Sequence, residues 1–384
     1  MRLLSTVERI NAIQFLTGVG IMAGFTYIPL FLRDFKATNE EVAFVAAGFA
    51  VLLFFSSIIA GRIADLTSRT RVVIVGLVST ALTFFFVSLS NSITSLALFR
   101  ILSGLTIGIY PAALAALSFE TRKGFLGKFS SFNSLGWACG ALFGGIVAEF
   151  TSYSTTFFLS GLLFVTALIL AFTIPDTTLL KKVESESQPF LPLSVFKTNA
   201  LVYLTLLLRH GTASAVWVFW PLFLEEIGAS DSIIGVIQAL NFLTQFFIMF
   251  LLTDRGDPKT LILIGFGLSG LTFMLMITFP ELLIVGIAQL ILGIGWSALY
   301  VGVLRRSVEN ATERATAAGG LGATLSISGL AGPIIASFLA LWIEEPFMLT
   351  MWVAMAASFL AGFIYLVWNK DSSNVSNVFI ANSV

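Results

Sequence analysis

Residues Gly61–Arg71 read GRIADLTSRTR and close one long apolar run, 42–63, shortly before another, 72–87, begins. A helix needs about 20 apolar residues to cross the ~30 Å hydrocarbon core of a bilayer. Because lipid offers irregular backbone no hydrogen-bonding partner, a short charged connection between two such runs predicts a turn at the membrane surface. Three arginines and one aspartate of this stretch are therefore expected at that interface.

The composition of the whole chain sets its class. Hydrophobic residues make up 57% of the 384 residues and charged residues 11%, and the mean hydropathy is +0.96. A soluble domain of this size could not bury so much apolar surface, so we expect an integral membrane protein. The net charge of zero argues against nucleic-acid binding, and the single Cys139 and single His210 leave neither a disulfide nor a metal site.

Twelve apolar runs follow one another and predict an all-α membrane protein with 12 transmembrane helices in two six-helix repeats. The longest polar interval, Asp176–Lys197, divides the runs six and six and is interpreted as a cytoplasmic linker. The expected domains are 1–175 and 199–384, joined by the linker 176–198. The runs lie at 11–33, 41–63, 72–89, 94–118, 129–150, 154–174, 199–224, 231–252, 259–278, 281–303, 316–341 and 346–368.

The distribution of lysine and arginine predicts the orientation. If both termini are cytoplasmic, 17 of the 21 basic residues lie on inner loops or tails, two lie outside and two, Arg100 and Arg209, lie within runs. Inner loops of membrane proteins carry an excess of basic residues. We therefore expect a multi-pass protein of the cell membrane with a cytoplasmic N-terminus and C-terminus.

The two halves of the sequence repeat each other. The tetrapeptide PLFL occurs at Pro29–Leu32 and again at Pro221–Leu224, half the length of the chain apart. In the second half, Asp254 and Arg255 occupy the place that Asp65 and its arginines have in the first. This repeat supports two parallel six-helix units.

The Gly61–Arg71 stretch resembles the signature loop between the second and third helices of the major facilitator superfamily. That loop has a glycine, a small residue before an aspartate, and then a basic cluster. The resemblance implies that loop charges pair with neighbouring helix ends and hold one face of a transporter shut. The implied gating residues are Gly61, Asp65, Arg69, Arg71, Asp254 and Arg255, with Ala64 as the small residue, whereas Leu66, Ser68 and Thr70 depart from the pattern.

Arg100 in the fourth run precedes Gly104 and Gly108, and this spacing resembles the fourth-helix motif of the same family. A charge inside a span costs several kcal/mol unless it is paired or hydrated. We expect Arg100 to face a cavity, with extension of its side chain to the outer surface as the alternative. The fifth run carries Asn133, Gly136, Gly140 and Gly144 on one face. These glycines resemble the motif of exporters in the family, although Ala141 replaces its proline, and close helix packing would also explain them.

Arg209 and His210 lie in the seventh run, about 15 Å from its end and close to the bilayer midplane. Neighbours on a helix point about 100° apart, so only one of the two is expected to point squarely into a cavity. His210 is a candidate proton carrier because histidine titrates nearest to physiological pH. The alternative is a structural pair satisfied by carbonyl groups and water.

Further polar and aromatic residues recur at helical spacing and predict a pathway for substrate and protons. Buried amides can also serve only to join helices, and that alternative stays open. Asp34 is the second candidate for the proton site. The predicted pathway contains Tyr27, Asp34, Arg100, Tyr110, Asn133, Trp137, Arg209, His210, Trp217, Trp220, Asn241, Gln245, Gln289, Trp296 and Tyr300.

Proton-coupled efflux of a small organic compound by alternating access is the leading hypothesis. Because the formal charge inside the membrane is positive, neutral, lipophilic or anionic compounds are favoured over cations. The alternatives are proton-coupled uptake of a sugar, metabolite or organic anion, and a non-transporting membrane sensor. No catalytic constellation or phosphate-binding loop is evident, so we expect no enzyme and no cofactor. The expected partners are the substrate, protons and the bilayer, with the protein acting as a monomer.

Overall fold

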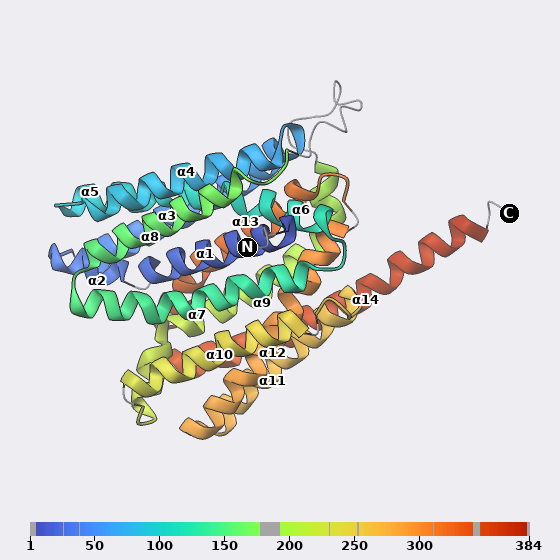
Figure 1. Cartoon of the computed structure of the whole chain (residues 1–384). Coiled ribbons are helices and arrows are strands. Elements are labelled where there is room, and N and C mark those ends of the chain that lie inside the picture. The colour runs from blue at the N-terminus through green and yellow to red at the C-terminus, as the bar shows by residue number, and fades with distance from the viewer. Residues whose placement is uncertain are drawn as a thin grey trace.

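The computed structural model describes residues 5–25, 27–37, 39–176, 193–229, 231–251, 253–309, 311–340 and 346–381, and almost all of them are helical. No strand occurs within these ranges, so the all-α prediction is confirmed (Figure 1). Most of the predicted linker, 176–198, lies outside the described residues.

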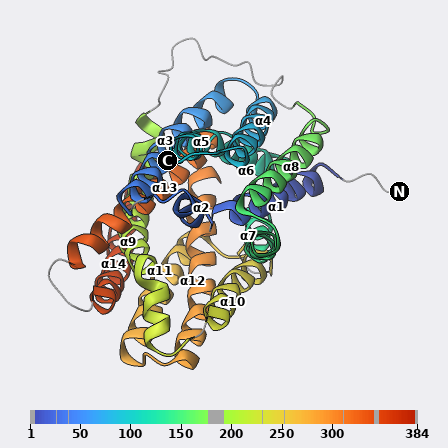
Figure 2. The same cartoon turned by 90° about the vertical axis from the view of Figure 1, so that its left-hand side faces the viewer.

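The helices before that interval are here named the first group. Figure 2 shows them packed together in an end-on view, with α1, α3, α4, α5, α6 and α8 gathered on one side. Their bounds are α1 Thr6–Phe25, α2 Ile28–Asp34, α3 Asn39–Leu66, α4 Arg69–Ser88, α5 Ile93–Ile107, α6 Tyr110–Thr121, α7 Leu126–Phe150 and α8 Tyr153–Ala171.

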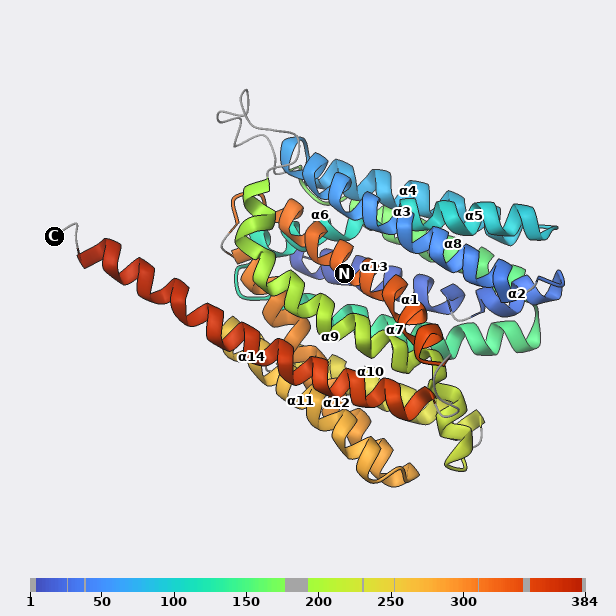
Figure 3. The same ribbon diagram turned by 180° about the vertical axis from the view of Figure 1, so that it is seen from behind.

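The helices after the interval are here named the second group. α14 runs beside α9 and α11 and extends past the end of the other helices (Figure 3). Their bounds are α9 Leu193–Glu226, α10 Asp231–Leu251, α11 Pro258–Thr278, α12 Leu282–Glu309, α13 Arg314–Ala340 and α14 Pro346–Ala381.

Within the described residues, nine helical segments are long and apolar enough to cross a membrane. The other three predicted runs are also helical. The run 11–33 forms α1 and α2, 199–224 lies within α9, and 231–252 corresponds to α10, which contains the shorter apolar helix Val236–Leu251.

Two predicted runs are interrupted near a proline. A proline inside a helix removes one backbone donor, and its ring clashes with the carbonyl four residues earlier. Pro29 stands four residues after the last residue of α1, and Pro111 stands four residues after the last residue of α5. Conversely, α9 begins at Leu193, six residues before its predicted start, and the amide of Asn199 donates to the Val195 carbonyl within that extension.

The glycine face of α7 packs directly on α1. A methyl group at Gly136 or Gly144 would collide with the backbone carbonyl of Phe15 or Ala23. Such close contact of two helix backbones requires glycine and is typical of packing within membranes. Close packing therefore accounts for the positions of these glycines, without reference to the direction of transport.

Candidate functional site

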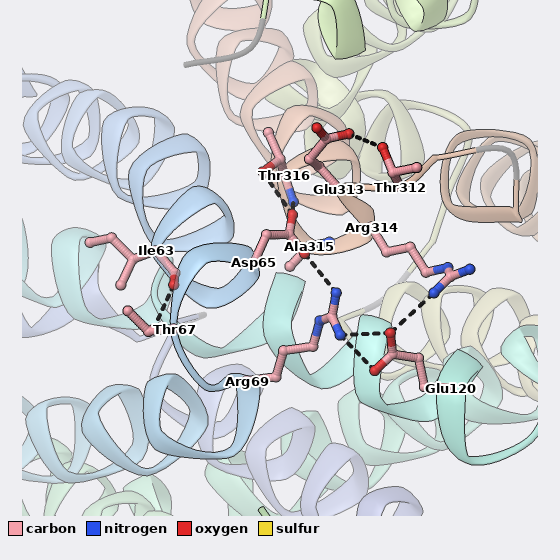
Figure 4. Close-up of polar contacts among 10 residues, drawn as sticks. All are labelled: Ile63, Asp65, Thr67, Arg69, Glu120, Thr312, Glu313, Arg314, Ala315 and Thr316. Carbon is pink, nitrogen blue, oxygen red and sulfur yellow. Dashed lines mark hydrogen bonds and ion pairs between the residues drawn. The ribbon is translucent and has the colours of Figure 1, made fainter. Parts of the chain in front are cut away.

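Asp65 lies in the last turn of α3 and caps the first turn of α13, 250 residues further along the chain. Its carboxylate accepts hydrogen bonds from the backbone N–H groups of Ala315 at 3.1 Å and Thr316 at 2.7 Å, and from the Thr316 hydroxyl at 2.8 Å (Figure 4). The first N–H groups of a helix have no partner within the helix and carry its positive dipole end. The Asp65 side chain is only 5% exposed, so this contact joins the first group of helices to the second through a shielded charge.

Arg69 extends this contact into a network that we name the Asp65 cluster: Asp65, Arg69, Glu120, Arg314 and the start of α13. Arg69 donates to Asp65 at 2.7 Å and to both oxygens of Glu120 at 2.6 Å. Glu120, in the last turn of α6, also pairs with Arg314 at 3.1 Å. Figure 4 shows these four charged side chains between α3, α4, α6 and α13. The charges alternate in sign along the cluster, so each carboxylate accepts from at least one guanidinium donor. Asp65 is shielded from water, whereas Glu120 lies at the exposed edge of the cluster.

The second half of the chain contains a matching network, here the Asp254 cluster. The Asp254 carboxylate accepts from the backbone N–H groups of Gly127 at 2.6 Å and Lys128 at 3.0 Å, at the start of α7. Arg305 of α12 supports it by donating to the carbonyls of Thr253 and Gly256 and by pairing with Glu309 at 2.9 Å. Burial raises the pKa of Asp254, although the two backbone donors oppose this shift.

The two clusters share one steric requirement but meet it with different helices. At the Asp65 cluster the glycine is on α3, where a Cβ on Gly61 would collide with the Ala315 carbonyl. At the Asp254 cluster the glycine is on α7, where a Cβ on Gly127 would collide with the Thr253 hydroxyl. The loop with Asp254 has no glycine in the place of Gly61. Gly127, on the helix that Asp254 caps, provides the close approach instead.

Arg209 lies midway along α9 and is only 2% exposed. Its Nε donates to the Ser269 hydroxyl of α11 at 3.1 Å, and its guanidinium carbon lies 5.4 Å from the Trp296 ring centre. The ring of His210 stacks on the same indole, with centroids 4.7 Å apart, and Tyr300 lies beside it at 5.8 Å. Both members of the pair thus contact Trp296. Which of the two points squarely into a cavity stays a prediction. We name Arg209, His210, Ser269, Trp296 and Tyr300 the Arg209 cluster.

Arg100 is also buried, at 5% exposure. Its guanidinium lies 3.9 Å from the ring centre of Phe49 and 5.2 Å from that of Phe25, and it donates to Ser103 at 3.3 Å. A side chain that extended to the surface would not be enclosed by aromatic rings in this way. Among the residues that the structure describes, neither Arg100 nor Arg209 has a carboxylate within ion-pair distance.

The predicted amides of the second group bond to one another. Asn241 donates to the backbone and side-chain oxygens of Gln289 at 3.1 Å, and Gln245 donates to Asn241 at 2.5 Å. Ser134 of α7 donates to Gln245 at 3.4 Å and so connects this chain to the first group. These contacts join α7, α10 and α12 as interhelical hydrogen bonds. The Nε2 group of Gln289 is buried without a partner among the described residues.

The remaining predicted pathway residues lie apart from the Arg209 cluster. Tyr27 stacks on Tyr153, Tyr110 packs edge-on to Phe164 and against Gly76, and Asn133 lies beside Gly18. Trp137 meets Phe242 of the second group edge-on, and its buried Nε1 has no partner within the described chain. Trp217 packs edge-on to the buried Trp220. Asp34 is exposed at the end of α2. Their roles in transport stay predictions.

Sequence reasoning missed several members of the two clusters. Glu120, Arg305 and Arg314 stand at the ends of apolar runs, where charges also collect for solubility, so position alone did not distinguish them. The internal repeat was a usable signal, because the aspartate of each loop caps a helix of the other half. Arg255, which the sequence selected, is exposed, and Arg305 makes the contacts expected of it.

Comparison with known proteins matches this architecture. The family model described as Major Facilitator Superfamily matches residues 10–209 and 202–380. The chain belongs to the Major Facilitator Superfamily. It is accordingly a secondary transporter and not an enzyme, and its apolar helices make it a multi-pass protein of the plasma membrane.

Individual relatives are distant but cover nearly the whole chain. The Quinolone resistance protein NorA of Staphylococcus aureus is 24% identical over 363 residues, covering 89% of this chain and 92% of the relative. The Tetracycline resistance protein, class B, of Escherichia coli is 26% identical over 353 residues, covering 84% and 85%. The crystal structure of the human organic anion transporter MFSD10 superposes with a TM-score of 0.80 at 15% identity, covering 94% and 98%, which shows a shared fold.

Proposed function

We propose that this transporter exports a small neutral, lipophilic or anionic organic compound in exchange for protons. The two resistance proteins to which the chain is similar support export. The observation that best supports an alternating-access mechanism is the capping of α13 by Asp65. This contact joins the two groups of helices at one end of the molecule. In this proposal the groups are two domains, 1–175 and 199–384, connected by the linker 176–198 and acting as a monomer.

Charge distribution supports an orientation in which the Asp65 and Asp254 clusters face the cytoplasm with both termini. Among the described residues, the hydrogen bonds and ion pairs between the two groups lie at this end or within about two turns of the start of α7. Breaking these contacts would let the cytoplasmic ends separate. The described conformation is therefore proposed to be closed toward the cytoplasm.

The Arg209 cluster is the proposed centre of substrate and proton binding. A guanidinium, an imidazole and an indole meet there, which supplies a charge for anions, an aromatic face for lipophilic rings and one titratable group. A second buried arginine without a carboxylate partner among the described residues, Arg100, adds to the positive potential of the membrane interior. Organic cations are disfavoured for the same reason.

The test uses purified protein in liposomes with an imposed pH gradient and a panel of neutral, anionic and cationic compounds. Proton movement opposite to a neutral or anionic compound supports the proposal, and His210→Gln should then uncouple it. Movement of proton and compound in the same direction would favour uptake by symport. The same result with a permanent cation as the best substrate would contradict the proposed charge preference, and no movement with any compound would favour a sensor.

A further inference from the structure

A groove lies on the first group of helices, between α3 and α4, with the junction of α5 and α6 as its floor. Its volume is about 410 Å³, within the ~300–1,000 Å³ of small-molecule sites. Apolar side chains form most of the lining, among them Ile59 and Ile63 from α3, Val75 from α4 and Leu105 from α5. These four side chains are all exposed in the isolated protein, so the groove opens on the surface that faces lipid.

The hydroxyl groups in the lining are already occupied. Ser56 donates to the Leu105 carbonyl, which has lost its usual helical partner at the α5–α6 junction. Thr67 donates to the Ile63 carbonyl at 2.6 Å. An occupant of the groove would therefore gain by burying apolar surface, not by forming hydrogen bonds with its walls.

The length of the groove matches one leaflet of a bilayer. Ser56 lies in α3 and Thr67 directly after its end, 11 residues further along the chain, which corresponds to ~16 Å at 1.5 Å per residue. The hydrocarbon core is ~30 Å thick, so one leaflet contributes about half of it. The groove runs from the surface turn between α3 and α4 to the depth at which an acyl chain of that leaflet ends.

Arg71 supplies the charge at the mouth of the groove. Its side chain is 75% exposed and pairs with Asp176, 3.3 Å away. An exposed ion pair of this kind contributes little free energy, so a phosphate can replace the carboxylate. The neighbouring Arg69 points into the Asp65 cluster, where two carboxylates hold it. Arg71 is thus the guanidinium in the lining that can meet a headgroup.

We propose that this groove binds an anionic phospholipid from the leaflet beside the Asp65 cluster. One acyl chain lies along Ile59, Ile63 and Val75, and the phosphate lies against Arg71. The cation at the mouth, the apolar walls and the one-leaflet length together specify an amphiphile with a single negative headgroup. The bilayer supplies such a molecule at this depth without any further partner.

Native mass spectrometry of the detergent-purified protein, titrated with phosphatidylglycerol or phosphatidylcholine, tests the proposal. Arg71→Gln should weaken the first phosphatidylglycerol binding step about fivefold, since a basic residue near an anionic headgroup contributes about 1 kcal/mol. Phosphatidylcholine binding should not change. Val75→Trp, which fills the groove from α4, should weaken phosphatidylglycerol binding at least as much, and Ile59→Phe provides the same test from α3 should the first variant fail to fold.

Two variants serve as matched controls. Arg255→Gln removes an exposed arginine from the corresponding loop of the second group, and Leu82→Trp enlarges an exposed side chain on α4 outside the groove. Both should leave phosphatidylglycerol binding unchanged. An equal loss in Arg255→Gln would attribute binding to general surface charge and overturn the proposal. Unchanged lipid binding in both groove-filling variants would also overturn it, including the case in which transport of a lipophilic compound is lost instead.

Discussion

Arg209 and Arg100 place two guanidinium groups inside the helical bundles, and neither meets a carboxylate among the described residues. Isolated charge is expensive in this environment, so each arginine depends on polar and aromatic neighbours. Arg209 has Ser269, His210 and Trp296, whereas Arg100 has Phe25, Phe49 and Ser103. An anionic or electron-rich substrate would stabilise the buried guanidinium of Arg209. The burial of this charge therefore supports the proposed preference for anions over cations.

Replacing Arg209 by Gln should lower the affinity for an anionic compound by about 10-fold to 100-fold, because a hydrogen bond to a charged group contributes about 1.5–3 kcal/mol. Arg209→Lys should give a smaller loss, since it keeps the charge but not the planar group against Trp296. Binding of the purified protein to fluorescent anionic and neutral compounds measures both effects. The neutral compound is the control, and unchanged anion affinity in Arg209→Gln would remove this residue from the substrate site.

Asp254 makes its loop contact sensitive to pH. Burial at the start of α7 raises the pKa of this carboxyl above its usual 3.8. A proton is therefore held more firmly when the contact is made than when the loop is free in water. The contact should therefore become more stable as the pH falls toward 3.8, and it should lose this stabilisation as the pH rises through the raised pKa.

Spin-label distances across the start of α7 and the end of α10, measured over this pH range, would show the closed fraction rising with acidity. Asp254→Asn should abolish the dependence, because its amide does not titrate. A pH response that persists in Asp254→Asn would assign it to another group.

At the scale of elements, two helix pairs carry the contact between the groups: α3 with α13, and α7 with α10. In the first pair Asp65, at the end of α3, caps the start of α13; in the second Asp254, in the loop after α10, caps the start of α7. In each pair a glycine allows the two backbones to approach. The polar contact and the steric contact lie within one turn of each other. Opening either interface therefore requires both to separate together.

Gly61→Ala should shift the protein toward a form that is open at this end, because the added methyl collides with the Ala315 carbonyl. Overpacking of this kind costs about 1–3 kcal/mol. Spin labels at the exposed Thr67 and Thr312, in a Cys139→Ser background, would report a longer distance. Gly286→Ala is the matched control, since its methyl would meet nothing within 4 Å. An unchanged distance in Gly61→Ala would contradict the prediction, because it would mean that α3 and α13 accommodate the methyl group without separating.

At the scale of the molecule, the two groups of helices contact each other through two corresponding loops, one with Asp65 and one with Asp254. The Asp65 and Asp254 clusters bring together charges from helices that are far apart in the sequence. The Arg209 cluster and the bonded amides of α10 and α12 lie further along the helices. This separation divides the proposed gate from the proposed binding site. It also lets one end open without dismantling the other contacts.

Cysteine labelling in intact cells should confirm the proposed orientation. In a Cys139→Ser background, an Asn91→Cys variant, between α4 and α5, should react with a membrane-impermeant maleimide. A Lys123→Cys variant, between α6 and α7, should react only after lysis. Both positions are exposed, so accessibility of the side chain does not distinguish them. The reverse labelling pattern would invert the topology and place the Asp65 cluster outside.

The class of protein, the apolar helices, the loop signature and the internal repeat can all be predicted from the amino-acid sequence alone. These features follow from the transfer of residues between water and lipid, which is a local property of each segment. The buried positions of Arg100 and Arg209 were also open to prediction, because a charge within an apolar run is visible in the sequence.

Which side chains contact one another is evident only from the three-dimensional arrangement of the helices. Asp65 reaches a helix that begins 249 residues later, Arg209 and His210 approach one indole, and the amides of α10 and α12 bond to each other. The groove beside Arg71 likewise depends on how α3 and α4 separate above the α5–α6 junction. The physical reason is that these contacts are fixed by long-range packing of helix faces, whereas hydropathy and charge along the chain fix only which segments are helices and where they end.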